Sequence, residues 1–131
     1  MKRYAFLVLA TTLLFTACGS GINVDKLYGR WRYIKVENPN ANPPTYVPRQ
    51  QLKTEQPYVE FSQNNEMQIV WGGKVLSYGT FTVDGSNIHF TEQLPEGQKR
   101  EFPFFVSSFN GRDMVFETLG KDGTRVTAVK L

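Results

Sequence analysis

Short alternating segments separated by tight-turn residues run through this chain from Pro57 onward, and they limit the folds available to it. Apolar and polar residues alternate within the segments, which predicts β-strands with one buried face. Gly72-Gly73 and Asn110-Gly111 are clear separators, because both suit the positive φ values of two-residue hairpin turns. No segment has a helical period with capping residues, and no strand–helix alternation indicates a parallel sheet. The chain is therefore predicted to be all-β and antiparallel.

Eight strands are expected, most of them joined by hairpins: residues 28–37, 57–62, 66–71, 74–83, 87–91, 99–109, 113–119 and 124–131. Eight antiparallel strands in sequence order close into an up-and-down barrel, which removes the exposed edges of an open sheet. A two-sheet sandwich of the same strands is the alternative, and the hairpin connections favour the barrel. The predicted fold class is an eight-stranded antiparallel meander β-barrel.

Three irregularities are expected within these strands. Gly79 predicts a bend, and Pro103 predicts either a bulge or a gap in the pairing, because proline cannot donate to a ladder. In the first strand, strict alternation places Trp31 and Val36 on opposite faces, although both are apolar. A bulge between Trp31 and Ile34 reconciles the two faces.

The N-terminal residues have the pattern of an export signal. Lys2 and Arg3 precede an apolar block that is shorter than the roughly 20 residues a membrane-spanning helix needs, and small residues follow it. Residues 1–17 are therefore predicted to be a signal peptide. Cys18 is the only cysteine, and it is either an ordinary unpaired thiol or the site of a lipid attachment.

The segment Phe15-Thr16-Ala17-Cys18 resembles a bacterial lipobox, although leucine is usual where Phe15 stands. The resemblance implies that Cys18 is acylated, with residues 18–26 as a tether and residues 27–131 as the barrel domain. Several acyl chains on one cysteine give stable membrane attachment. Gly19 is not the aspartate that holds many Gram-negative lipoproteins at the inner membrane. The expected location is the outer membrane of a bacterial envelope, facing the periplasm or the surface.

The charge balance argues against a nucleic-acid partner. The formal net charge is +3, and Lys2 and Arg3 belong to the predicted leader, so the exported chain is nearly neutral. No basic stripe or arginine cluster stands out in the sequence. With one cysteine the chain has no internal disulfide, and stability has to come from an apolar interior. Ten Phe, six Tyr and two Trp supply such an interior.

Gly29-Arg30-Trp31, at the start of the first strand, resembles the G-x-W signature of lipocalins. The glycine lets another backbone approach closely, and the indole can plug the closed end of a barrel. Together with the lipobox, a long first loop and the eight-strand meander, the chain resembles the short lipocalin-like domains of exported bacterial lipoproteins. That family places a basic residue of the last strand across the tryptophan. Arg125 and Lys130 both qualify, and we take Arg125 with Gly29 and Trp31 as the barrel-floor motif.

Residues 38–56 form a long connection between the first two strands, and their four prolines exclude a central strand. Loops of this length are often functional. The lipocalin resemblance implies that this one covers or flanks the barrel mouth, with Tyr46 and Val47 as a lid. The alternative is a linker without a role.

The resemblance implies that the barrel binds a small hydrophobic or amphipathic ligand, and the alternative is that the same side chains fill the interior. The T-D-x-x motif and the C-terminal helix of larger lipocalins are absent, so no particular ligand carries over. A second hypothesis is a solid barrel that docks an envelope protein through the outward aromatics Tyr58, Tyr78 and Phe105. The candidate ligand-lining residues are Tyr46, Phe61, Trp71, Phe81, Phe90, Phe102, Phe104 and Phe116.

Catalytic and metal-binding patterns are weak in the sequence. The single histidine, His89, is expected on an outward strand face. No cysteine pair, His-x-His or Asp-x-Asp loop offers converging metal ligands, and no glycine-rich phosphate loop precedes a helix. Glu60, Glu66, Glu101 and Glu117 can meet as a carboxylate pair for glycosidic chemistry, but solvated strand faces are the expected explanation. We therefore predict a monomeric binding protein without a cofactor, a metal or enzymatic activity.

Overall fold

The structure is a computed structural model that describes residues 21–118 and 123–131. The predicted leader, Cys18 and part of the predicted turn before the last strand lie outside the described residues. Among residues 21–118 and 123–131, no helix combines the length and the apolarity that a membrane span requires.

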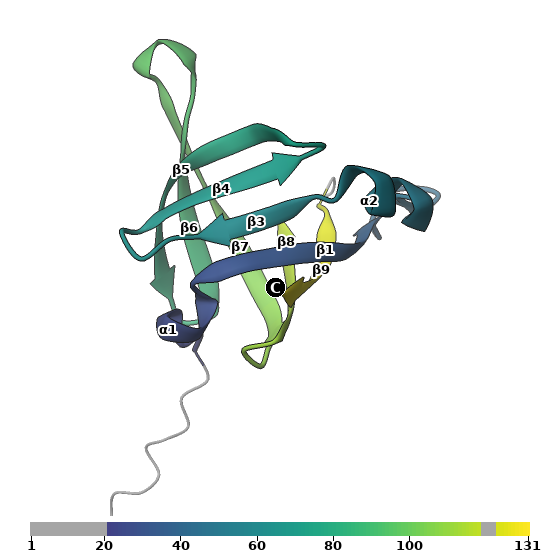
Figure 1. Ribbon diagram of the computed structural model, residues 1–131, viewed down its shortest axis with the longest axis horizontal. Coiled ribbons are helices and arrows are strands. Elements are labelled where there is room, and N and C mark those ends of the chain that lie inside the picture. Colours follow the sequence, from purple (N-terminus) through teal and green to yellow (C-terminus); the bar gives the residue numbers. More distant parts are fainter. Residues whose placement is uncertain (1–20, 119–122) are drawn as a thin grey trace, which may run out of the picture.

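A closed barrel of eight antiparallel strands forms the body of the protein (Figure 1). Each strand pairs with the next, and β1 also pairs with β9, from Trp31 opposite Lys130 to Glu37 opposite Arg125. The meander barrel is thus confirmed and the sandwich excluded, because the first and last strands share a ladder. The strands are β1 (Gly29–Asn38), β3 (Tyr58–Phe61), β4 (Glu66–Trp71), β5 (Lys74–Asp84), β6 (Asn87–Gln93), β7 (Lys99–Phe109), β8 (Asp113–Thr118) and β9 (Arg125–Lys130).

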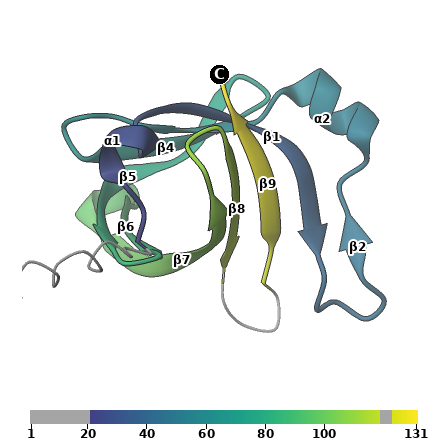
Figure 2. The same ribbon diagram turned by 90° about the horizontal axis from the view of Figure 1, so that it is seen from below.

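Four short elements are added to the barrel: α1 (Val24–Leu27), β2 (Thr45–Tyr46), α2 (Arg49–Glu55) and η3 (Pro95–Gly97). Residues 38–56 are therefore more ordered than the plain loop that we predicted. No periodic pattern of apolar residues predicts α2, because Leu52 is the one buried residue in its seven positions. Figure 2 shows α2 and β2 outside the ring of strands, beside β1.

The first strand contains the expected bulge. Its pairing with β9 shifts between Tyr33 and Lys35, and Ile34 is the extra residue. Trp31, Tyr33 and Val36 all face the core as a result, while the Ile34 side chain is 44 % exposed. The bulge turns two successive residues outward, which becomes important for the site described below.

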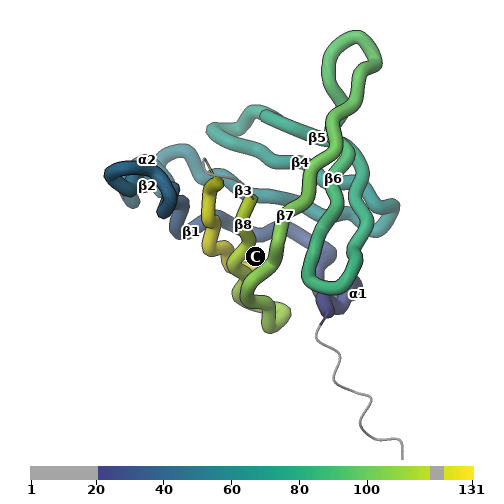
Figure 3. The backbone as a smooth tube through the Cα atoms, turned by 180° about the vertical axis from the view of Figure 1, so that it is seen from behind, coloured from purple at the N-terminus to yellow at the C-terminus, as the bar shows by residue number. Residues whose placement is uncertain are grey.

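The bend at Gly79 separates β5 into two parts. Residues before it pair with β4, Gly79 and Thr80 pair with both β4 and β6, and residues from Phe81 onward pair with β6. A Cβ atom at Gly79 would overlap the carbonyl oxygen of Thr91, so the close approach of the two backbones requires glycine here. The β4–β5 and β6–β7 hairpins consequently diverge from each other (Figure 3).

Pro103 pairs with His89 of β6 in an unbroken register, so no bulge forms at this position of the β6–β7 ladder. On its other side, the described ladder between β7 and β8 begins at Phe104 opposite Thr118, where the described residues of β8 end, and the predicted gap at Pro103 therefore lies outside the described residues. The irregularity of this ladder lies further along, between Val106 and Ser108.

Trp31 occupies the closed end of the barrel, where it is fully buried and donates its indole N–H to the Leu27 carbonyl at 2.8 Å. The cation across the ring is Lys130, whose Nζ lies 5.5 Å from the ring centroid and donates to the Lys26 carbonyl at 2.8 Å. Our choice of Arg125 is wrong. Arg125 begins β9, whereas Trp31 lies opposite the end of that strand, so the antiparallel register keeps the two apart.

The segment before β1 packs on the same closed end. The Ile22 N–H donates to the Gly85 carbonyl at 2.9 Å, and Ile22 and Val24 both contact the core. The residues that we assigned to a tether are therefore part of the folded domain from Ile22 onward. Leu27, the last residue of α1, is fully buried and completes this plug.

Candidate functional site

Most of the aromatic residues predicted to line a ligand cavity fill the barrel interior instead. Their rings contact one another at centroid distances of 5.1 to 6.0 Å, mostly edge to face. Such contacts are typical of a packed core. The buried members of this cluster are Phe61, Phe81, Phe90, Phe104 and Phe116.

The three other predicted ligand residues lie at the margins. Phe102 and Trp71 are half-buried and pack against the core from the open end. Tyr46 is 72 % exposed and sits on β2, outside the ring of strands. Its predicted role as a lid over the interior is therefore wrong, because β2 pairs with the outer edge of β1.

A groove between α2 and the bulge of β1 contains the residues of the long connection. It consists of two cavities of about 420 and 300 Å³ that share Ile34, Arg49 and Leu52. We call it the α2 groove. Its lining residues are Arg32, Tyr33, Ile34, Lys35, Val36, Tyr46, Val47, Arg49, Leu52, Lys53 and Gln56.

Two local features of the chain build this groove. The bulge at Ile34 places an apolar and a basic side chain next to each other on the outside of β1. Opposite them, Leu52 anchors α2 in the core, while the exposed Arg49 and Lys53 lie one helical turn apart on α2. The Val47 N–H donates to the Val36 carbonyl at 2.9 Å and holds the connection against the strand.

The C-terminal end of α2 is fastened to the β4–β5 hairpin. The Gly72 N–H donates to the Glu55 carbonyl at 2.9 Å, and the Trp71 indole N–H donates to the Glu55 carboxylate. Gln51 donates to the same carboxylate oxygen at 3.0 Å. The hydrogen bonds from Trp71 and Gln51 lower the pKa of Glu55 below its ordinary value, because they stabilise the charged form.

The α2 groove carries positive charge over an apolar floor. Arg32, Lys35, Arg49 and Lys53 all line it, and no acidic residue does. Lys35 lies 3.8 Å from Glu37, and within residues 21–118 and 123–131 no ion pair engages the other three cations. A groove of this kind can hold an anionic group together with a short apolar chain.

A polar cluster lies at the open end of the barrel and is already fully paired. Glu92 is 8 % exposed and accepts from the Ser77 hydroxyl at 2.6 Å and from Arg100 at 2.7 Å. The Arg100 guanidinium also lies 5.5 Å from the centre of the Phe102 ring. Because these side chains bond to one another, we assign the cluster a structural role that links β5, β6 and β7.

The predicted carboxylates separate into different environments. Glu60 and Glu66 both line a cavity of about 740 Å³ on the outer face of β3, β4 and β5. Glu101 is exposed on β7, and Glu117 lies 3.7 Å from Arg125 at the β8–β9 ladder. Of the four, the structure brings only the first two to one cavity.

The remaining candidates have exposed positions. His89 points outward as expected and lies 3.7 Å from Asp84. Tyr58 is half-buried under the Arg30 guanidinium, at 4.8 Å, while Tyr78 is 57 % exposed and Phe105 is 39 % exposed. Within the part of the chain that the structure describes, no three His, Cys, Asp or Glu side chains gather as metal ligands do.

The sequence did not reveal Arg32, Arg49 and Lys53 as site residues, because they are far apart in sequence and become neighbours only when α2 docks. The one feature of the sequence that could have indicated this site is the long connection of residues 38–56, in which Arg49 and Lys53 follow the prolines. Comparison with known families and curated proteins finds no matching family model and no similar curated protein.

Proposed function

We propose that this chain is a lipid-anchored, lipocalin-like envelope protein that binds a small amphipathic acid in the α2 groove. The observation that carries the proposal is four cations and no acid around an apolar floor of Ile34, Val36 and Leu52. We infer a binding role rather than catalysis, because no Ser, Cys, His, Asp or Glu side chain lines this groove.

The groove is a better ligand site than the barrel centre. Trp31, Phe90 and Met114 are fully buried, and the interior aromatics occupy the space between the strands. A ligand there would have to displace well-packed rings at a cost of several kcal/mol. The α2 groove is open, and its larger cavity of about 420 Å³ falls within the usual range of small-molecule sites.

The chemistry of the lining selects the ligand class. Arginine offers a planar fork of donors that suits carboxylates and phosphates, and two of the four cations are arginines. The side chains of Ile34, Val47 and Leu52 can cover a short alkyl chain beside the charged group. A monocarboxylic acid with an aliphatic tail satisfies both parts of the groove.

The proposed anchor is compatible with an accessible groove. The described chain begins at the closed end, where the Ile22 N–H bonds to Gly85. Cys18 precedes Gly21 by three residues, which can span at most about 11 Å. A lipid on Cys18 therefore holds the closed end near the membrane, whereas α1 and α2 lie on opposite sides of the barrel (Figure 1).

Binding of dodecanoate, dodecanol and dodecylammonium by the purified protein tests this function. We expect dodecanoate to bind most tightly, and the double variant Arg49→Ala/Lys53→Ala to weaken its binding at least tenfold. The double variant Lys74→Ala/Lys99→Ala removes two exposed cations outside the groove and should bind as the wild type does. Equal affinity for dodecanol, or equal losses in both double variants, would refute the proposal.

A second candidate function is docking of another envelope protein, and the first part of β5 favours it. Val75 and Leu76 are 52 % and 61 % exposed on consecutive positions, more than the single exposed apolar residues common on protein surfaces. Capture from detergent-solubilised envelope should then lose a partner when both residues become serine. An unchanged set of partners removes this candidate.

A further inference from the structure

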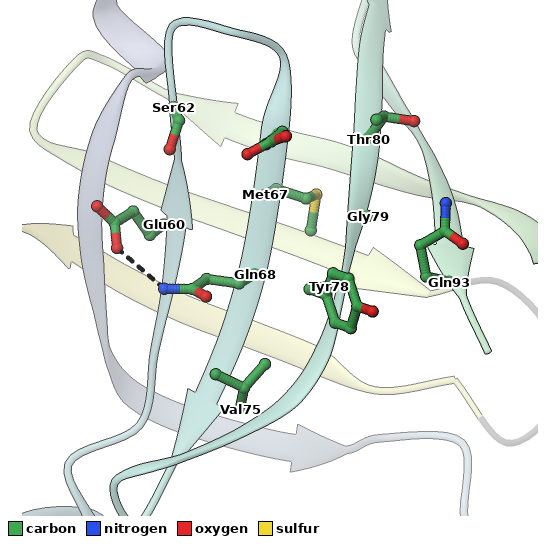
Figure 4. A pocket seen from close by; sticks show the side chains of 10 residues that line it. Glu60, Ser62, Met67, Gln68, Val75, Tyr78, Gly79, Thr80 and Gln93 are labelled. Carbon is green, nitrogen blue, oxygen red and sulfur yellow. Dashed lines mark hydrogen bonds between the residues drawn. The ribbon is translucent and has the colours of Figure 1, made fainter. Parts of the chain in front are cut away.

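The outer face of β3, β4 and β5 carries a second hollow that the proposed acid binding does not use. Its volume is about 740 Å³, and we call it the sheet groove. Figure 4 shows it from outside, with the Tyr78 ring between Gln68 and Gln93. Glu60, Glu66 and Thr80 also contribute to its lining.

Strand register arranges the floor of the sheet groove as a row. Glu60 of β3 lies opposite Gln68 of β4, and Gln68 lies opposite Tyr78 of β5. The Gln68 amide donates to Glu60 Oε1 at 3.2 Å, and Arg30 of β1 donates to the same oxygen at 3.4 Å. The row therefore holds one carboxylate and one amide in fixed positions beside an aromatic ring.

The bend at Gly79 accounts for the hollow shape. Gly79 separates Tyr78 from Thr80 and approaches the Thr91 backbone more closely than any side chain permits. The part of β5 before the bend then leaves β6 and curves with β4, so that Tyr78 and Gln93 border the groove from two different hairpins.

The groups in this row are those that sugars require. Tyr78 is 57 % exposed and presents a ring on which the C–H face of a pyranose can stack. Planar amides and carboxylates offer paired donors and acceptors for adjacent hydroxyls, and the two glutamines and two glutamates supply both. A cavity of about 740 Å³ accommodates more than one sugar ring.

The acidic lining of the sheet groove restricts the class of glycan that it can bind. The lining contains Glu60 and Glu66 and no basic residue, while the nearest cation, Arg30, is already paired with Glu60 at 3.4 Å. A uronic acid or a sulfated sugar would be repelled. From this juxtaposition we propose that the sheet groove binds a neutral oligosaccharide through Tyr78, Gln68 and Glu60.

Titration of the protein with cellotetraose, maltotetraose, N-acetylchitotetraose and the acidic tetragalacturonate tests the proposal, with affinities measured by calorimetry and amide shifts by NMR. At least one neutral tetrasaccharide should bind, with the largest shifts around Tyr78. Tyr78→Ala should weaken that binding at least tenfold and Gln68→Ala several-fold. Tyr46→Ala removes another exposed tyrosine, one that lies in the α2 groove, and should leave the oligosaccharide affinity unchanged.

Failure of all three neutral sugars to bind overturns the proposal, as do preferential binding of tetragalacturonate and equal losses in the two tyrosine variants. Dodecanoate affinity of Tyr78→Ala should equal that of the wild type. Because dodecanoate binding reports on the α2 groove alone, it shows whether a loss of sugar binding leaves the proposed function intact.

Discussion

The α2 groove and the sheet groove lie on the same barrel, yet their linings are opposite in chemistry. Four cations surround an apolar floor in the first, and two carboxylates and two amides surround an exposed tyrosine in the second. Each groove depends on an interruption of regular pairing, the bulge at Ile34 or the bend at Gly79. Where side chains fill a small barrel, irregularities in its wall are the places that remain for ligands.

The two grooves also differ in what supports them. The sheet groove is built on three paired strands, so its shape depends on the backbone of the barrel. The α2 groove depends on a helix of seven residues that is held by Leu52 and by the bonds of Glu55. We therefore expect the sheet groove to be lost only when the whole barrel unfolds, whereas the α2 groove can be lost by local unfolding of α2.

The largest effect is expected from Gly79→Ala. The added methyl group overlaps the Thr91 carbonyl, and the forced separation of β5 and β6 should lower the free energy of unfolding by about 3 kcal/mol. Denaturant titration measures this change. The neighbouring variant Thr80→Ala should change stability by less than about 0.5 kcal/mol, since Thr80 is exposed. Equal stability of both variants would contradict a requirement for glycine.

Leu52→Ala should impair the α2 groove and leave the sheet groove intact. Loss of the buried side chain costs about 2 kcal/mol, at the low end for leucine because a short surface helix can relax. We expect dodecanoate binding to be lost while the affinity for a neutral oligosaccharide is kept. Gln50→Ala, at an exposed position of α2, is the control. Loss of both affinities would show that the grooves are not independently supported.

Salt should distinguish the grooves by their charge. Raising NaCl from 0.1 to 1 M shortens the Debye length from about 10 to about 3 Å, which screens an anion from the exposed Arg32, Arg49 and Lys53. Dodecanoate affinity, relative to that of dodecanol, should fall several-fold, and oligosaccharide affinity should stay constant. An equal decline of both affinities would contradict the claim that only the α2 groove binds its ligand through charge.

The smallest effect concerns the pH dependence of α2. The pKa of Glu55 is lower in the folded protein, so its contribution to docking is complete above its ordinary pKa and is lost as the pH falls through the lowered value. Amide exchange in α2 should accelerate there, before the barrel unfolds. Glu55→Gln should flatten this dependence, and Glu96→Gln, in η3, should leave it as in the wild type. If Glu55→Gln does not alter the acceleration of exchange at low pH, the hydrogen bonds of the Glu55 carboxylate are not its cause.

The sequence predicted most of the barrel because its strands are encoded locally. Val59 and Phe61 alternate inward in β3, and Ile88 and Phe90 do so in β6, as their period-two pattern required. Gly72-Gly73 and Gly111 adopt the positive φ values expected at their hairpins. These features depend on neighbouring residues, and for that reason a single sequence contains them.

The candidate site was less predictable, because it combines residues from separate segments. The aromatic residues that we expected around a ligand are apolar side chains on inward faces, and such side chains fill a core as readily as they line a cavity. Which of these happens depends on how closely the strands approach, and no local pattern records that distance. The choice of Lys130 rather than Arg125 across Trp31 likewise follows from the register of β9 on β1.

The strand order, the tight turns and the bend at Gly79 followed from the sequence alone, since alternation and turn chemistry act over a few residues, and the hairpins favoured a barrel over a sandwich. The β1–β9 ladder that closes the barrel, the packed interior, and the docking of α2 with its cations beside the bulge became visible only in the folded chain. Those outcomes depend on contacts between residues distant in the chain, whose energies appear only after the barrel has closed.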